Sequence, residues 1–142
     1  MNFSNKDGGK IIFELIKTIQ DKKDFLSEVD GKIGDGDHGI NMNKGFTMTY
    51  CKVNGKDYDM TTAFSVLGDT LLEDIGGSMG PLYGAFFDGL SEASEDHDVI
   101  DKKTFQKMIH TALEAIQDIG NAKRGDKTLL DTLIPAVEAY DA

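Results

Sequence analysis

Apolar residues recur at intervals of three and four along most of the chain, which is the spacing that places side chains on one face of an α-helix. The successive stripes are Ile12, Leu15, Ile16 and Ile19; Phe25, Leu26 and Val29; Met42, Phe46, Thr49 and Val53; Phe64, Leu67, Leu71 and Ile75; Leu82, Ala85, Phe86, Gly89, Leu90 and Ala93; Phe105, Met108, Ile109, Ala112, Leu113, Ile116 and Ile119; and Leu130, Leu133, Val137 and Tyr140. No segment alternates apolar and polar residues with a period of two, so the pattern predicts an all-α fold. The first two stripes predict one or two helices before Asp30.

Glycine and proline mark several of the predicted helix ends. The helix that starts near Met42 is expected to end at Asn54–Gly55, and Gly120 is expected to cap the helix before it. Pro81 fits the first turn of a helix, where no backbone donor is needed. Pro135 falls inside the last predicted helix and is expected to bend or interrupt it.

Composition and charge limit the classes of protein to which this chain can belong. A chain of 142 residues with 39% apolar residues is expected to form one domain, over residues 1–142. The formal charge is −10 and no basic run exceeds two residues, which argues against nucleic acid as a direct ligand. Cys51 is the only cysteine, which favours a reducing, cytoplasmic location. No segment approaches the roughly 18 consecutive apolar residues of a membrane span, so no membrane partner is expected.

The candidate chemistry lies in three glycine-containing segments, each before a predicted helix. They read DGKIGDGDHGINMN (30–43), GGSMGPLYG (76–84) and GNAKRGDKT (120–128). In the first, the carboxylates of Asp30, Asp35 and Asp37 would repel one another unless a cation lies among them, and oxygen ligands suit Mg²⁺ or Ca²⁺. A solvated acidic loop with helix-capping aspartates explains the same residues about equally well.

The second segment lets backbone amides approach a ligand at the start of a helix, which favours an anion such as phosphate. Such segments are common, and this one is neither a P-loop nor a dinucleotide fingerprint. Together with the carboxylates, however, it indicates a metal–phosphate site. His38 is interpreted as a neutral hydrogen-bonding residue beside a hard cation. From its local sequence, the third segment is an ordinary capped helix start.

The stretches IGDGDHGINMNKGF, GGSMGPLYGAFF and GDKTLLDTLIPAVE, in this order and at these separations, resemble the nucleotide-binding L subunit of dihydroxyacetone kinase, especially the phosphotransferase-dependent bacterial type. The resemblance spans nearly the whole chain. It implies an antiparallel barrel of eight helices with ADP and two Mg²⁺ ions at one end. Because the family continues for several dozen residues beyond Ala142, it also implies a C-terminally truncated chain with about six of the eight helices. Apolar faces such as Leu133 and Val137 are then expected to be exposed, and ADP binding to be weak or dependent on association.

The resemblance also implies roles for individual residues. Asp30, Asp35 and Asp37 fall on the metal-binding aspartates of the family. The implied nucleotide contacts are His38, Gly39, Ile40, Asn41, Gly77, Ser78, Met79, Gly120 and Leu129. Where many relatives read Gly-Gly-Ala-Ser-Gly, this chain reads Gly-Gly-Ser-Met-Gly, so a hydroxyl contact is either lost or supplied by Ser78. No side chain is expected to act as acid, base or nucleophile, because catalysis here would be electrostatic, through the metal ions.

In relatives of the phosphotransferase type, ADP is a retained cofactor. A histidine phosphoprotein subunit phosphorylates it, and the resulting ATP donates its γ-phosphate to dihydroxyacetone on a separate substrate-binding subunit. The resemblance therefore implies these two subunits as partners, with a second copy of the chain or a transcription regulator as further ones. Two alternatives stay open: the nucleotide domain of an ATP-dependent dihydroxyacetone kinase or fatty-acid kinase, and a non-catalytic regulatory binding module.

Overall fold

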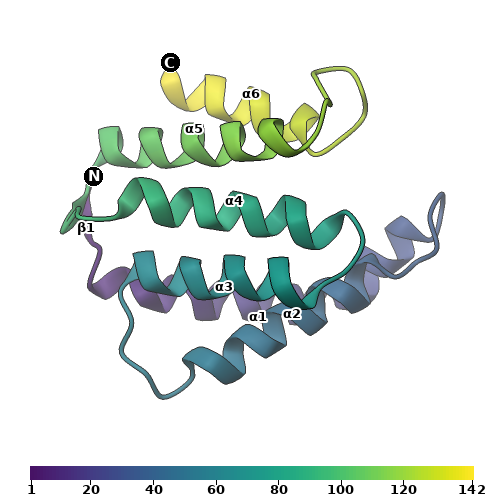
Figure 1. Ribbon diagram of the computed structural model, residues 1–142, viewed down its shortest axis with the longest axis horizontal. Coiled ribbons are helices and arrows are strands. Elements are labelled where there is room, and N and C mark those ends of the chain that lie inside the picture. The colour runs from purple at the N-terminus through teal and green to yellow at the C-terminus, as the bar shows by residue number, and fades with distance from the viewer.

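Helices dominate the computed structural model, which describes residues 1–142 (Figure 1). A short 3₁₀ helix, η1 (Asp7–Lys10), leads into α1 (Ile11–Asp30), α2 (His38–Val53), α3 (Met60–Asp74), α4 (Met79–Ser94), α5 (Lys102–Ile119) and α6 (Leu130–Asp141). The strands β1 (Phe3–Ser4) and β2 (Val99–Ile100) pair antiparallel, with Phe3 opposite Ile100 and Ser4 opposite Val99. The all-α prediction is confirmed. Strands of two residues are too short to produce an alternating pattern, so this ladder could not be predicted from the sequence.

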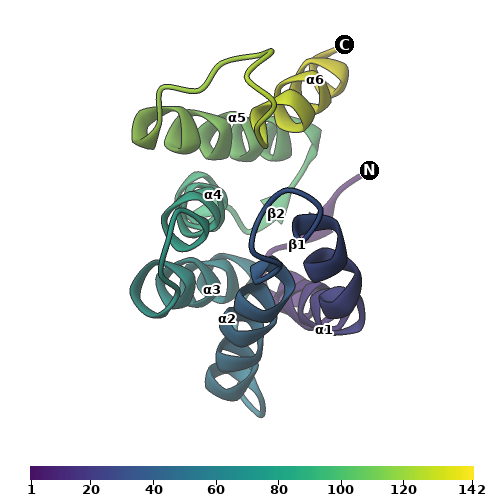
Figure 2. The ribbon, with the colours of Figure 1, turned by 90° about the vertical axis from the view of Figure 1, so that its right-hand side faces the viewer.

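The six helices follow one another around an arc, and each lies beside the next (Figure 2). Consecutive helices run in opposite directions, with α3, α4 and α5 side by side (Figure 1). Helices α1 and α6 lie at the two ends of the arc (Figure 2). This arrangement confirms the antiparallel helical fold implied by the resemblance. No helix is both long enough and apolar enough to cross a membrane.

The core fills the space between the helices and is built from the apolar stripes. Phe46, Leu67, Leu71 and Met108 are all less than 3% exposed. The prediction that the apolar face of α6 is exposed is wrong for Val137, which is 2% exposed. Leu133 is half-buried and so is only partly exposed. The physical reason is that α6 packs against α5, so the chain covers this face itself.

The helix ends agree with the predictions in most places. The region before Asp30 forms one continuous helix, and α2 ends at Val53, as expected. Pro81 lies in the first turn of α4. Pro135 does not interrupt α6, which continues through it to Asp141. Gly120 does follow α5 as its C-terminal cap, but its backbone is extended rather than left-handed.

Candidate functional site

The three glycine-containing segments lie at the same end of the molecule, on the right of Figure 1. They form the connections from α1 to α2, from α3 to α4 and from α5 to α6. Antiparallel neighbours make this arrangement unavoidable, because each odd-numbered helix ends where the following even-numbered helix begins. Consecutive segments start about 45 residues apart in sequence, and only the packing of the helices brings all three to one end.

The three aspartates of the first segment form a cluster, called here the carboxylate cluster (Asp30, Asp35 and Asp37). One carboxylate oxygen from each lies within 4.8 Å of the others. Asp30 is the last residue of α1, and Gly36, with φ of +78°, turns the loop so that the other two face it. The backbone N–H of Asp37 donates to Oδ1 of Asp35 at 3.2 Å, and that of His38 donates to Oδ2 of Asp30 at 3.3 Å.

Within the carboxylate cluster, the pKa of Asp37 is shifted. A hydrogen bond with Asp35 raises the pKa of Asp37 above its usual value, and burial and the negative charges of Asp35 and Asp30 add to this effect. A hydrogen bond with Asn41 acts in the opposite direction. No lysine or arginine forms an ion pair with any of the three aspartates. A cation among them would therefore relieve a repulsion that the chain itself leaves in place.

Gly39 allows the start of α2 to lie directly against α1. A β-carbon built at this position would be 1.8 Å from the carbonyl oxygen of Lys23 and 2.6 Å from Oγ of Ser27. Any side chain would force the two helices apart. The close contact therefore fixes the direction in which α2 leaves the loop, and with it the positions of His38 and Asn41.

The first and second segments line one depression with a volume of about 330 Å³. Its lining comprises Asp35, Asp37, Asn41, Gly76, Gly77, Ser78 and Met79. Gly77 has a φ of +72°, in the left-handed region that favours glycine. Ser78 occupies the N-cap position of α4 but makes no capping hydrogen bond with its side chain. The depression thus combines carboxylate oxygens with the start of a 16-residue helix.

A separate apolar cavity of about 180 Å³ lies between α4 and the start of α6, and one of its lining residues is Tyr83, which the sequence analysis did not single out. The ring of His38 is 6.1 Å from that of Tyr83, and Tyr83 also lines the apolar cavity with Leu129. The remaining lining residues are Phe86, Phe87, Thr132, Leu133 and Ala136. Four nucleotide contacts implied by the resemblance are not among the lining residues of either space: His38, Gly39, Ile40 and Gly120. Gly120 ends α5 at the same end of the molecule, and Ile40 is 59% exposed.

Asp131 shapes the third segment. Its carboxylate accepts backbone N–H groups from Gly125 at 2.7 Å, Lys127 at 2.7 Å and Thr128 at 3.2 Å. These bonds, with that of Gly125 first, lower the pKa of Asp131 below its usual value. The sequence did carry a signal for this role, since an acidic residue three positions after Thr128 resembles a capping box.

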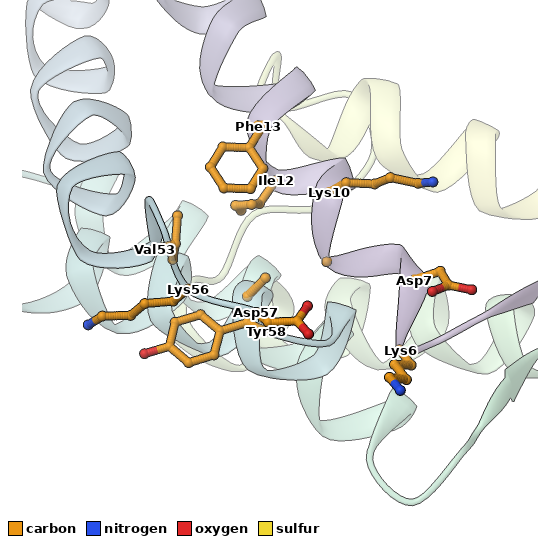
Figure 3. Close-up of a pocket in the computed structure, with 11 residues that line it drawn as sticks. Lys6, Asp7, Lys10, Ile12, Phe13, Val53, Lys56, Asp57 and Tyr58 are labelled. Carbon is orange, nitrogen blue, oxygen red and sulfur yellow. The ribbon is translucent and has the colours of Figure 1, made fainter.

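A third cavity, of about 260 Å³, lies at the opposite end of the helices, between the start of α1 and the connection from α2 to α3 (Figure 3). Lys6, Lys10 and Lys56 surround it. The side chains of Lys10 and Lys56 extend away from each other in Figure 3, so these charges do not converge on a common point. The end that carries the three glycine-containing segments is the better candidate.

Known proteins resemble this chain over most of its length. It is 39% identical over 122 residues to "PEP-dependent dihydroxyacetone kinase 1, ADP-binding subunit DhaL" of Listeria innocua, a match that covers 85% of this chain and 61% of that protein. It is also 39% identical over 114 residues to "PTS-dependent dihydroxyacetone kinase, ADP-binding subunit DhaL" of Lactococcus lactis, covering 80% and 57%. The chain thus spans about three fifths of the length of these relatives.

A solved structure shares the fold. The dihydroxyacetone kinase from C. freundii, crystallised in complex with AMP-PNP and Mg²⁺, superposes with a TM-score of 0.77 and 25% sequence identity. The match covers all of this chain and 26% of that one. The DAK2 domain matches residues 32–142, from the loop of the carboxylate cluster to the end of α6. This chain therefore belongs to the DAK2 domain family.

Proposed function

We propose that this chain is the ADP- and Mg²⁺-binding, phosphoryl-transferring part of a dihydroxyacetone kinase of the phosphoenolpyruvate-dependent type. The observation that carries this function is the depression of about 330 Å³, in which Asp35 and Asp37 face the segment from Gly76 to Met79. Carboxylates for a hard cation and backbone amides for an anion are the two halves of a metal–phosphate site. The names of the relatives identify the nucleotide as ADP and the substrate as dihydroxyacetone.

The carboxylate cluster fits Mg²⁺ by its chemistry. All three ligands are oxygens, they lie within 4.8 Å of one another, and no cationic side chain pairs with them. Two Mg²⁺ ions bound there would offset the negative charge of the phosphoryl group during transfer. The role of Asp30, Asp35 and Asp37 is to hold these ions, and no side chain is needed as acid, base or nucleophile.

The remaining residues position the nucleotide. The backbone of Gly77, Ser78 and Met79 would contact phosphate at the start of α4, where the helix dipole favours negative charge. Residues 38–41 would contact the phosphates from the other side of the depression. The base would enter the apolar cavity beside Leu129, and Gly120, which follows α5, would also contact the nucleotide. Where many relatives have a serine, this chain has Met79, which carries no hydroxyl. The backbone N–H groups of this segment remain available to bind phosphate.

Phosphoryl transfer also requires partners. Phosphate would arrive from a histidine phosphoprotein subunit that phosphorylates the retained ADP, and it would leave to dihydroxyacetone on a separate substrate-binding subunit. The surface beside the carboxylate cluster suits such a contact. Ile33 in the same loop is fully exposed, and Ile40 in the first turn of α2 is 59% exposed. Apolar side chains at the edge of a polar site are typical of a surface that a partner protein covers.

Calorimetric titration with ADP, with and without Mg²⁺, tests the site. The wild type should bind ADP more tightly with Mg²⁺, and Asp35→Asn and Asp37→Asn should lose that gain. Asp21→Asn, which changes an exposed aspartate in the middle of α1, is the matched control. Equal Mg²⁺ dependence in all four proteins would remove the carboxylate cluster from the mechanism.

The likeness to a kinase crystallised with AMP-PNP favours a second candidate, an ATP-dependent kinase whose nucleotide exchanges freely. Dialysis of the ADP-loaded protein in Mg²⁺ separates the two. Retention of ADP supports the phosphoenolpyruvate-dependent type, and rapid loss supports the ATP-dependent type. Tight ADP binding without phosphoryl transfer to dihydroxyacetone, even with both partner subunits present, would instead indicate a regulatory module.

A further inference from the structure

Tyr83 pairs with the ring of His38, at the start of α2, and also lines the apolar cavity. It lies on α4, one turn after the segment that lines the depression, and its ring is 6.1 Å from that of His38, inclined at 55°. The same ring lines the apolar cavity together with Leu129. His38 in turn follows directly on the carboxylate cluster and donates its backbone N–H to Asp30.

We propose that Tyr83 is a positioning residue that joins the two halves of the nucleotide site, supporting His38 at the phosphate end while forming a wall of the cavity for the base. This role rests on the proposed function. A single rigid ring that pairs with His38 and lines the apolar cavity fixes the position of one relative to the other, which an enzyme that retains its nucleotide needs.

The ring of Tyr83, rather than its hydroxyl, makes these contacts. The side chain is partly buried, and its burial raises the pKa of the phenol above the usual value. The hydroxyl forms no hydrogen bond within the chain, whereas the centroid distance to His38 lies in the range of aromatic pairs. Phenylalanine should therefore replace Tyr83 without loss, and leucine should not.

Phe86 provides a matched control because it lines the apolar cavity but pairs with Phe87 rather than with His38. Affinities for Mg²⁺·ADP and for adenosine are measured by calorimetry on wild type, Tyr83→Phe, Tyr83→Leu and Phe86→Leu, after thermal melts confirm that each is folded. Phe86→Leu should weaken both ligands by the same factor, about threefold. Tyr83→Leu should weaken Mg²⁺·ADP by about tenfold but adenosine by only about threefold. Tyr83→Phe should stay within about twofold of wild type for both ligands.

Equal losses for the two ligands in Tyr83→Leu would overturn the joining role, and so would failure of phenylalanine to restore binding. A second measurement needs no nucleotide. The ring-proton NMR shifts of His38, assigned with His38→Gln, should move in Tyr83→Leu and stay in place in Phe86→Leu. Unmoved shifts would also overturn the role. Absence of Mg²⁺·ADP binding to the wild type would refute the proposed function itself, and this role with it.

Discussion

The contact of α1 with α2 at Gly39 gives the sharpest test of how the candidate site is positioned. Alanine at this position adds one methyl group, which would lie 1.8 Å from the carbonyl oxygen of Lys23 and 2.6 Å from Oγ of Ser27. The oxygen of Lys23 belongs to the backbone of α1 and cannot rotate away. Since nonbonded atoms prefer to be roughly 3.5 Å apart, the two helices must separate by about 1.7 Å.

The expected cost combines two opposing effects. Overpacking of a tight contact destabilises a protein by about 1–3 kcal/mol. Alanine also favours the helical state over glycine by up to about 1 kcal/mol, although Gly39 is only the second residue of α2. The net loss in the free energy of unfolding should therefore be about 1–2 kcal/mol. Displacement of the loop should also weaken Mg²⁺·ADP binding by about tenfold, because the proposed metal and phosphate contacts depend on its geometry.

Urea denaturation followed by circular dichroism measures the first effect, and calorimetry measures the second. Gly76→Ala is the control for stability, because its backbone φ is not positive and no atom lies within 4 Å of a β-carbon built there. Its free energy of unfolding should stay within about 0.5 kcal/mol of wild type. If Gly39→Ala is as stable as Gly76→Ala, the close approach of α1 and α2 does not exist in solution.

Three further predictions concern other parts of the molecule. Burial, followed by the negative charge of Asp69, raises the pKa of Asp88 to about 6. Because the folded chain holds this proton more tightly than the unfolded chain, the protonated group contributes stability that is fully present below about pH 4 and is lost as the pH rises through 6. After allowance for solvent screening, Asp88→Asn should therefore stabilise the chain by about 1 kcal/mol at pH 7.5 and by nothing at pH 4 in urea titrations; equal effects at both pH values would refute this. Ile33→Ser should lower the rate of phosphoryl transfer between subunits by about tenfold and leave ADP affinity unchanged, while Val99→Ser, exposed at the opposite end, should change neither. Asp131→Asn should speed amide hydrogen exchange at residues 125–128 by about tenfold, because it weakens the acceptor of three backbone N–H groups; unchanged exchange would mean that these bonds do not hold the third segment.

Local features of the chain were well predicted from sequence. The helices follow from a spacing of three to four residues, which depends only on the neighbours of each residue, and all the predicted helical segments are helical. The carboxylate cluster was found for the same reason. Its three aspartates lie within eight residues of one another, on a loop in which glycine permits tight turns. The proximity of side chains within one short segment can be inferred before the fold is known.

Two features that the sequence analysis missed depend on how distant segments pack. Asn5 resembles any polar residue of a chain terminus, yet it is buried, and its side chain bonds to Thr61 and to the carbonyl of His97. The ladder of β1 and β2 joins segments almost 100 residues apart.

The sequence alone thus determined which helices form and which residues supply charged groups, backbone amides and aromatic rings. Only the tertiary structure placed the segment from Gly76 to Met79 against Asp35 and Asp37, and only it placed Tyr83 beside His38. The reason is physical. Helix periodicity specifies which face of a helix is buried, whereas the neighbour that covers that face depends on shape, such as the missing side chain of Gly39 that allows α2 to lie against α1.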